Sequence, residues 1–330
     1  MKPLTINLAL QGGGAHGAFT WGVLSRLLDE EWLSFEGVSG TSAGAMNALM
    51  LAEGWRKGGR QGAKEQLSSF WNAIAEKGIK MPVPNFIEQS FNKLFMSMFE
   101  QFSPYDINVL DINPLKDVLV ELVDFKALQL DCPHSLFIAA TEVTTGKLEL
   151  FREQELTVEH VLASACLPNL YKAVEIHNKF YWDGGYSGNP AVYPLIHDCE
   201  AEDVLIVLLQ PLQRDVLPQK TSQIKDRVNE LTFHCAFLRE MRGILDVKMS
   251  AQRWGLVSGE FEKKIRQMRT HLIENEELMS SLDQFSKYNS SGEFLHCLHD
   301  EGFSTAEQWL ETNAGDLGKR DRCDVVGLFR

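Results

Sequence analysis

The chain has no run of eighteen consecutive apolar residues, so the sequence predicts no helix that spans a membrane. Its first residues, Met1-Lys2-Pro3, lead directly into an apolar stretch and lack the regions of a signal peptide. No two of the six cysteines have C-x-x-C spacing. In a long chain without a secretion signal, the even number of cysteines does not predict disulfides. We therefore expect reduced, mostly buried thiols and a cytoplasmic protein, for which peripheral contact with a membrane stays open.

Positive charge is scarce as well. The 32 Lys and Arg residues face 45 Asp and Glu residues, which gives a net charge of −13. Such a field disfavours a nucleic-acid partner and does not attract anionic lipid head groups. Internal repeats and low-complexity segments are also absent. The composition, 44% hydrophobic and 23% charged, is typical of a globular protein with a large core.

The chain does contain short apolar stretches that alternate with helical patterns. The stretches predict strands at residues 4–10, 35–39, 136–142, 147–151, 180–182 and 204–209. This alternation is typical of an α/β fold with a mostly parallel central sheet flanked by helices. We place an α/β catalytic domain at residues 1–211, with a helical insertion at about 60–110. Residues 212–330 have a helical, charged pattern and predict a helical extension, a cap over the site or a surface for a homodimer.

Two apolar stripes leave alternatives open. A Phe-rich stripe with helical spacing runs along residues 85–102 and predicts either a packed helix or a lid that rests on a lipid surface. A second stripe, between Ile224 and Leu238, indicates either a buried helix face or an oligomer contact.

The most informative motif is the pentapeptide G-T-S-A-G at residues 40–44, which matches G-x-S-x-G. It lies between a strand-like stretch and a good helix former, which is the setting of a nucleophile elbow. Gly40 and Gly44 lack a Cβ atom, so the chain can turn sharply there and expose the hydroxyl of Ser42. We therefore take Ser42 as the candidate nucleophile.

A glycine-rich turn, Q-G-G-G-A-H-G at residues 11–17, offers hydrogen-bond donors for such a nucleophile. A serine esterase must stabilise the oxyanion that forms when the hydroxyl attacks a carbonyl carbon. Consecutive glycines allow backbone N–H groups to face an anion without steric hindrance. Gly12, Gly13 and Gly14 are therefore the candidate oxyanion hole.

The same turn also satisfies G-x-G-x-x-G through Gly12, Gly14 and Gly17, which is the alternative of a dinucleotide-binding turn. That fingerprint requires an acidic residue at the end of the second strand. Here Glu36 stands at the beginning of that strand, so the pattern favours the oxyanion hole.

The best candidate for the base is Asp183, in the sequence F-Y-W-D-G-G-Y at residues 180–186. An Asp-Gly pair is also common in simple turns. With a candidate nucleophile and an anion-binding loop in the same chain, Asp183 followed by Gly184 and Gly185 becomes the preferred partner. An aspartate with an ordinary pKa near 4 is a weak base for a hydroxyl, so burial would have to raise that pKa.

Histidines offer two weaker alternatives. His197, beside Asp198, is the best candidate for a histidine base of a catalytic triad. His296, Cys297 and His299 resemble a metal-binding cluster, but no second pair of ligands follows at zinc-finger spacing.

Taken together, these motifs resemble those of the patatin-like phospholipase family. The resemblance rests on the blocks at residues 12–17, 40–44 and 183–185, which occur in the family's order. The segment at 163–168 resembles the family's block that leads from a helix to a proline before the aspartate strand. The resemblance covers roughly residues 4–210.

The resemblance implies a Ser–Asp dyad that requires neither a metal nor a cofactor. Ser42 would attack an ester carbonyl, Asp183 would take and return the proton, and Gly12, Gly13 and Gly14 would hold the oxyanion. The implied substrates are acyl esters of phospholipids, lysophospholipids or neutral lipids.

One residue departs from the family's pattern, because His16 stands where Arg or Lys is usual. A histidine with an ordinary pKa titrates near neutrality, which predicts a weaker or pH-dependent role at this position. The interpretation we favour is a lipid acyl hydrolase. The alternatives are an acyltransferase or a polyester or small-ester hydrolase on the same scaffold, and a lipid-binding regulator without catalysis.

Overall fold

The computed structural model of the chain describes residues 2–77, 103–108, 111–214, 217–254, 259–321 and 325–329. The Phe-rich stripe at residues 85–102, with both of its interpretations, lies outside these residues. The same holds for much of the helical insertion predicted at about 60–110.

An eight-stranded sheet with the order β5-β6-β3-β2-β1-β7-β8, in which β4 pairs with β3, forms the centre of the described fold. The strands are β1 (Leu4–Leu10), β2 (Leu33–Thr41), β3 (Ser135–Glu142), β4 (Leu148–Arg152), β5 (Val174–Ile176), β6 (Lys179–Asp183), β7 (Asp203–Val207) and β8 (Arg269–Ile273). β3, β2, β1, β7 and β8 pair with one another in parallel, whereas β4 and β6 pair antiparallel with β3, and β5 pairs antiparallel with β6. The fold class predicted from the sequence, a mostly parallel sheet with flanking helices, is confirmed.

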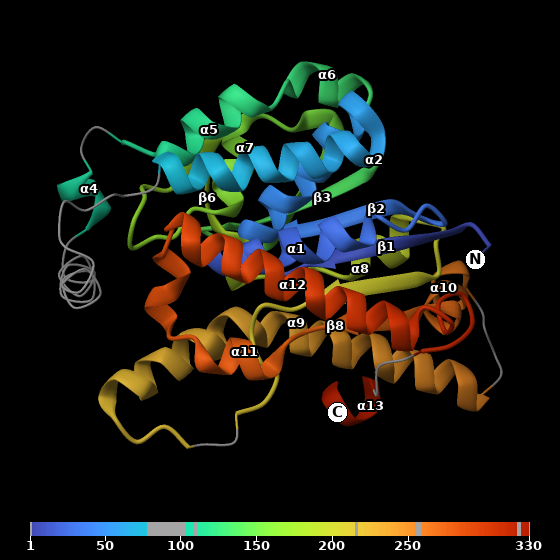
Figure 1. The fold of residues 1–330 in the computed structure, drawn as a ribbon. Helices are drawn as coiled ribbons and strands as arrows, with labels where there is room; N and C mark the ends of the chain where they lie inside the picture. The colour runs from blue at the N-terminus through green and yellow to red at the C-terminus, as the bar shows by residue number, and fades with distance from the viewer. Residues whose placement is uncertain are drawn as a thin grey trace.

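Helices cover both faces of this sheet (Figure 1). The helices of the described residues are α1 (Gly17–Leu27), α2 (Ala43–Lys77), α4 (Pro104–Ile107), α5 (Pro114–Leu122), α6 (Phe125–Leu130), α7 (Val158–Ser164), α8 (Tyr193–Asp198), α9 (Thr221–Trp254), α10 (Glu260–Gln267), α11 (Glu276–Ser281), α12 (Gly292–Asn313) and α13 (Val325–Phe329). The 3₁₀ turns η1 (Gly14–His16) and η4 (Gln284–Tyr288) lie next to the candidate site.

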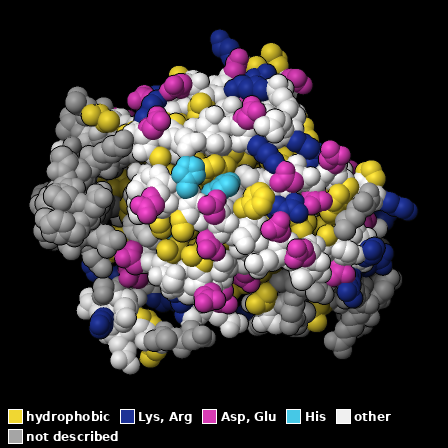
Figure 2. Space-filling view, in the orientation of Figure 1, with side chains coloured by type: hydrophobic (Ala, Val, Ile, Leu, Met, Phe, Trp, Pro, Cys, Tyr) yellow, Lys and Arg dark blue, Asp and Glu magenta, His cyan; other side chains and the backbone are white. Residues whose placement is uncertain are grey.

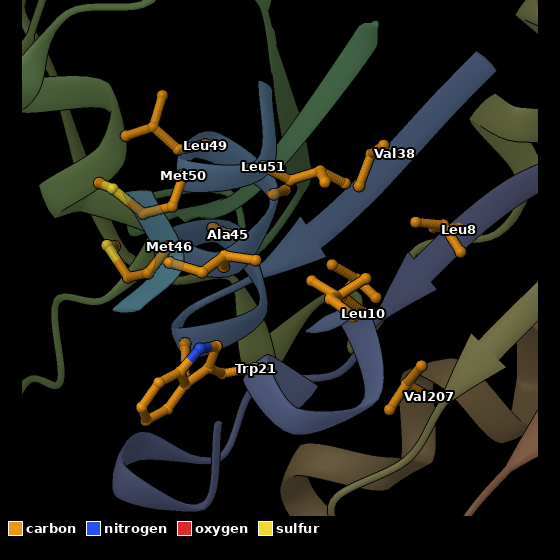
Figure 3. Close-up of a cluster of buried hydrophobic side chains, with 14 of the residues drawn as sticks. Leu8, Leu10, Trp21, Val38, Ala45, Met46, Leu49, Met50, Leu51 and Val207 are labelled. Carbon is orange, nitrogen blue, oxygen red and sulfur yellow. The ribbon is translucent and has the colours of Figure 1, made fainter. Parts of the chain in front are cut away.

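Two hydrophobic clusters lie on opposite faces of the sheet and make the fold three-layered. Leu8 of β1 belongs to the cluster with α1, α2, α7 and α12, while its neighbour Ala9 belongs to the cluster with α8, α9 and α10. Alternation of side chains along a strand explains this division, because successive residues point to opposite faces. Figure 3 shows part of the first cluster, in which Leu10 and Val38 from the strands lie near Leu51 of α2.

The C-terminal segment is not wholly helical, contrary to the pattern expected after residue 212. β8 pairs in parallel with β7 and extends the central sheet. The strand was missed because its sequence, R-T-H-L-I, is largely polar. Arg269 and His271 both bond the carboxylate of Asp203, at 2.8 and 2.7 Å, and this pairing makes two polar side chains compatible with a buried strand. The proposed boundary near residue 212 stays a prediction.

Other local predictions need correction as well. The glycine-rich stretch at residues 56–62 predicts a loop, but α2 continues through it with a kink at Gly58 and Gly59. The stripe on α9 is not buried throughout, because Ile224 and Val228 are 46% and 55% exposed. Two of the cysteines, Cys235 and Cys297, are exposed, whereas Cys166 and Cys199 are buried; all four are free thiols. Within the described residues, no helix is long and apolar enough to cross a membrane.

Candidate active site

Three segments that are distant in sequence meet at one edge of the sheet. The glycine-rich turn follows β1, Ser42 follows β2, and Asp183 ends β6. Thr41 lies opposite Ala139 of β3, and Asp183 lies opposite the next residue of the same strand. The register therefore brings Ser42 and Asp183 to the same level on the two sides of β3. This is the carboxyl edge of the parallel strands, where α/β proteins bind their ligands.

Ser42 occupies a strained turn between β2 and α2. Its φ of 53° lies in the left-handed region that non-glycine residues rarely adopt. Its N–H donates a hydrogen bond to Oγ of Ser164, at 3.0 Å, which anchors the turn to α7. A Cβ atom at Gly40 would lie 2.5 Å from the carbonyl oxygen of Gly44, and one at Gly44 would clash with the carbonyl of Leu10. The geometry is that of a nucleophile elbow, with both flanking glycines required by close packing.

The glycine-rich turn lies against this elbow but only part of it is free to bind an oxyanion. The N–H of Gly12 donates to Oδ1 of Asn189, at 2.7 Å. The expectation that Gly12 is an oxyanion donor is therefore wrong in this conformation, because its donor is already used. Among the described residues, no protein acceptor takes the N–H of Gly13 or Gly14. These two groups are the donors that remain.

The glycines of this turn allow close approach to the protein itself. A Cβ atom at Gly12 would lie 2.7 Å from the carbonyl oxygen of Thr41, and one at Gly17 would lie 2.6 Å from Cβ of Ala43. Gly14 has a φ of +59°, and a Cβ there would clash with the carbonyl of Lys287. Packing thus accounts for all three glycines of the G-x-G-x-x-G pattern without a dinucleotide.

Asp183, the candidate base, is only 1% exposed. Its Oδ1 accepts a hydrogen bond from the N–H of Gly185, at 2.8 Å. Its Oδ2 makes no hydrogen bond of regular geometry, although the hydroxyl of Ser42 is close enough to influence the carboxylate. In free enzymes, catalytic hydrogen bonds are often long or poorly aligned. The arrangement leaves Oδ2 available to the serine.

The environment of Asp183 raises its pKa, as the role of a general base would require. Burial raises the pKa of Asp183 from 3.8 to about 7. The N–H of Gly185, the hydroxyl of Ser42 and the charge of Lys287 oppose this effect and lower the pKa. A carboxylate with a pKa near 7 is well matched to general-base catalysis at neutral pH.

Both glycines after the aspartate are required by packing. A Cβ atom at Gly184 would clash with the carbonyl of Ala139, and one at Gly185 would clash with the ring of Phe233. The D-G-G sequence therefore packs tightly between β3 and α9. The contact with α9 shows that the C-terminal segment is part of the wall around the site.

His16 does not titrate near neutrality, contrary to expectation. It is 3% exposed, and burial, with a smaller contribution from Lys287, lowers its pKa from 6.5 to about 3. Its Nε2 lies 2.7 Å from Oγ of Ser286, and that hydroxyl donates to the carbonyl oxygen of Asp283. Nε2 therefore carries the proton, and Nδ1, which has no partner, is unprotonated. His16 is a neutral structural contact between the glycine-rich turn and η4.

The site opens into a cavity of about 310 Å³. Ser42, Asp183 and Gly12–Gly14 all line it. One wall is apolar and comes from α2 and α5, with Met46, Phe70 and Leu115. Further lining residues come from the C-terminal half of the chain and include the polar side chains of Asn229 and Lys287. This mixture of apolar and polar lining residues suits a ligand with an apolar chain and a polar end.

The histidine alternatives lie elsewhere. His197 pairs with Asp198 on the surface, at 2.7 Å, and does not line the cavity. His296 and His299 pack against Trp21 of α1, with ring centroids 5.5 and 4.1 Å apart. Figure 2 shows histidine side chains at the surface of this face, with acidic side chains spread around them. In the part of the chain that the structure describes, no group of three or more His, Cys, Asp or Glu residues could hold a metal ion.

Three residues at the site were not identified from the sequence. Ser164 anchors the elbow, Asn189 binds the glycine-rich turn, and Lys287 lines the cavity. Ser164 lies within the segment at 163–168 that resembles a family block, and Asn189 closely follows the D-G-G motif. Lys287 stands in the unremarkable stretch S-K-Y-N-S, and no sequence signal marks it.

This chain is similar to a known protein family and to solved structures. The family model described as Patatin-like phospholipase matches residues 8–196, a range that contains the serine, aspartate and glycine blocks. A search of the curated proteins found no match. Among solved structures, VipD from Legionella pneumophila is similar with a TM-score of 0.45 and 17% identity, over 94% of this chain and 67% of that one. The heterodimeric ExoU–SpcU complex from the type III secretion system of Pseudomonas aeruginosa is similar with a TM-score of 0.32 and 16% identity, over 96% of this chain and 60% of that one.

Proposed function

This chain belongs to the patatin-like phospholipase family, and from this premise we propose that it is a serine lipid acyl hydrolase that acts through Ser42 and Asp183. Its substrates would be acyl esters of phospholipids, lysophospholipids or neutral lipids. The observation that carries the proposal is the position of Asp183, a buried carboxylate with a pKa raised to about 7, beside a serine in a nucleophile elbow.

In the first half of the reaction, Oγ of Ser42 attacks the ester carbonyl carbon while Oδ2 of Asp183 accepts the hydroxyl proton. The carbonyl oxygen becomes an oxyanion, and the N–H groups of Gly13 and Gly14 would donate hydrogen bonds to it. One such donor is worth about 3–4 kcal/mol in the transition state. The tetrahedral intermediate then collapses, and the leaving alcohol takes the proton from Asp183.

In the second half, water hydrolyses the acyl-enzyme. Asp183 accepts a proton from water as its oxygen attacks the acyl carbon, and the same two N–H groups stabilise the second oxyanion. Collapse releases the carboxylic acid and returns the proton to Oγ of Ser42. The aspartate thus serves as base and acid in alternation.

Hydrolysis of a soluble neutral ester, p-nitrophenyl butyrate, tests the dyad. Ser42→Ala and Asp183→Asn should each lower kcat by at least about a thousandfold, as removal of a nucleophile or its base does in other serine hydrolases. Ser69→Ala and Asp131→Asn, on exposed side chains outside the cavity, are the matched controls. Retention of most activity by Asp183→Asn would show that the dyad is wrong.

A fluorophosphonate probe separates this proposal from a lipid-binding regulator without catalysis. Labelling of the wild-type protein but not of Ser42→Ala supports a reactive serine, and an unlabelled wild-type protein contradicts it. Product analysis with glycerol as a competing acceptor separates hydrolysis from acyl transfer. The cytoplasmic location, the membrane contact and a homodimer through the C-terminal helices stay predictions.

A further inference from the structure

We propose that Lys287 determines the specificity of this site: its ammonium group binds an anionic group of the substrate next to the scissile ester. The inference rests on the proposed function, because it names the substrate class of that same site. It assigns a direct role to the C-terminal segment, since Lys287 lies outside the residues that the family model matches.

Lys287 is the only Lys or Arg residue among the described residues that line the cavity. It belongs to η4, which is fixed to the glycine-rich turn at two points. The carbonyl of Lys287 occupies the space beside Gly14 that a Cβ atom would fill, and Ser286 accepts the hydrogen bond of His16. The backbone of the lysine is therefore held against the loop that carries the proposed oxyanion donors.

The ammonium group of Lys287 has no fixed counter-ion in the part of the chain described. It makes no hydrogen bond or ion pair there, although its side chain is half-buried. Glu230, the carboxylate with the strongest influence on it, is already paired with Arg214 and Arg227, at 2.5 and 3.1 Å. A half-buried cation that faces a cavity without a partner is an anion-binding group.

The charged and titratable groups around Lys287 come from several elements. Those that influence it, or that it influences, are Asp183, Glu230, Arg214, Asp226, His16 and His234. Burial lowers the pKa of Lys287, and the nearby carboxylates raise it. A bound anion would add to their effect and favour the charged ammonium group.

Two further polar residues line the same cavity as Lys287 and could bind a polar head group. Gln210 also lines the cavity, is 4% exposed, and has a side-chain oxygen without a hydrogen-bond partner. Asn229 of α9 is a further polar lining residue. The acyl chain would lie against the apolar lining residues from α2 and α5, and the charged end of the substrate would bind Lys287.

Two short, monomeric substrates that differ only in a phosphate group test the inference: monohexanoylglycerol and its 3-phosphate. The wild-type protein should hydrolyse the phosphate ester with the higher kcat/KM. Lys287→Met should lower the ratio of the two kcat/KM values by about ten- to a hundredfold, as expected for the loss of a hydrogen bond to a charged group. Lys287→Arg should retain most of the ratio, and Lys263→Met, which removes an exposed lysine of α10, should leave it unchanged. A phosphodiester, hexanoylglycerophosphocholine, shows whether one negative charge on the phosphate is sufficient.

Failure of the inference is distinct from failure of the proposed function. If the wild-type protein hydrolyses neither ester, the proposed function fails. If it hydrolyses both and Lys287→Met leaves the ratio unchanged, or lowers both kcat/KM values equally, Lys287 does not bind the anionic group. Should Lys287→Met not fold, inhibition of the wild-type protein decides: glycerol 3-phosphate should compete with the neutral ester at concentrations at least about tenfold lower than glycerol. Equal inhibition by the two would overturn the proposal.

Discussion

The substitution Asp183→Asn should stabilise the folded protein at pH 8, although it removes the proposed base. Burial raises the pKa of this carboxyl group from 3.8 to about 7. Between these two pH values the folded protein holds a proton that the unfolded chain releases. The stability that the protonated carboxyl group of Asp183 contributes is therefore fully present below pH 3.8 and is lost as the pH rises through about 7. Over the whole window the loss amounts to about 4 kcal/mol, at about 1.36 kcal/mol for each pH unit.

With an asparagine at this position, the free energy of unfolding does not fall in this way, because the amide does not ionise. Its Oδ1 can still accept the hydrogen bond from Gly185, and its NH₂ group can donate to the hydroxyl of Ser42. Between pH 5 and pH 8, the free energy of unfolding of the wild-type protein should fall by about 3 kcal/mol relative to that of the variant.

Urea denaturation of both proteins at unit steps from pH 5 to pH 8 measures this difference. Comparison at each pH removes the contribution of groups that titrate alike in both proteins, such as Glu240 and Glu274, whose pKa values burial raises to about 7. Asp131→Asn, on an exposed aspartate, is the control for the substitution itself. A difference in stability that stays constant from pH 5 to pH 8 would refute the reasoning.

The remaining predictions concern the reaction and its scaffold. The pH profile of kcat/KM on a neutral ester should rise with pH through an apparent pKa near 7, because Asp183 must be ionised to act as the base; a profile already flat at pH 5 contradicts this. Gly14→Ala should cost more than about 2 kcal/mol of stability, since strain at positive φ adds to a clash, whereas Gly146→Ala, also at positive φ but in open space, should cost only about 1 kcal/mol in the same thermal melts. Ser164→Ala leaves the partly buried N–H of Ser42 without its acceptor and should cost about 1–3 kcal/mol, measured as a lower midpoint of unfolding together with a lower kcat. Nitrogen NMR of His16 should show a neutral ring protonated on Nε2 from pH 5 to pH 8, and a charged ring at pH 6 would count against its burial.

Much of the parallel sheet could be predicted from the sequence because its central strands are continuous apolar runs. β1 was predicted at its observed bounds, and β7 is buried along its whole length. β8 escaped detection because Arg269 and His271 find their partner on a strand 66 residues or more away in the chain. A pattern of hydrophobicity contains no information on such a pair.

Some residues of the candidate site could likewise be predicted from the sequence, and others could not. Ser42 and Asp183 were identified because each lies in a short motif with adjacent or nearby glycines. The hydrogen bond from the N–H of Gly12 to Asn189 could not be predicted from the sequence, since the acceptor lies 177 residues away in the chain. Lys287 belongs to no motif, and only the packing of η4 on the glycine-rich turn brings it to the cavity.

By itself, the sequence determined which groups are available for chemistry and which turns present them, because a turn depends on the few residues that form it. Tertiary structure alone decided their protonation and their partners. The pKa of Asp183, the neutrality of His16 and the exposure of Lys287 to the cavity all depend on how much water distant segments exclude. Exclusion of water is a property of the assembled fold, and no short segment of the chain can specify it.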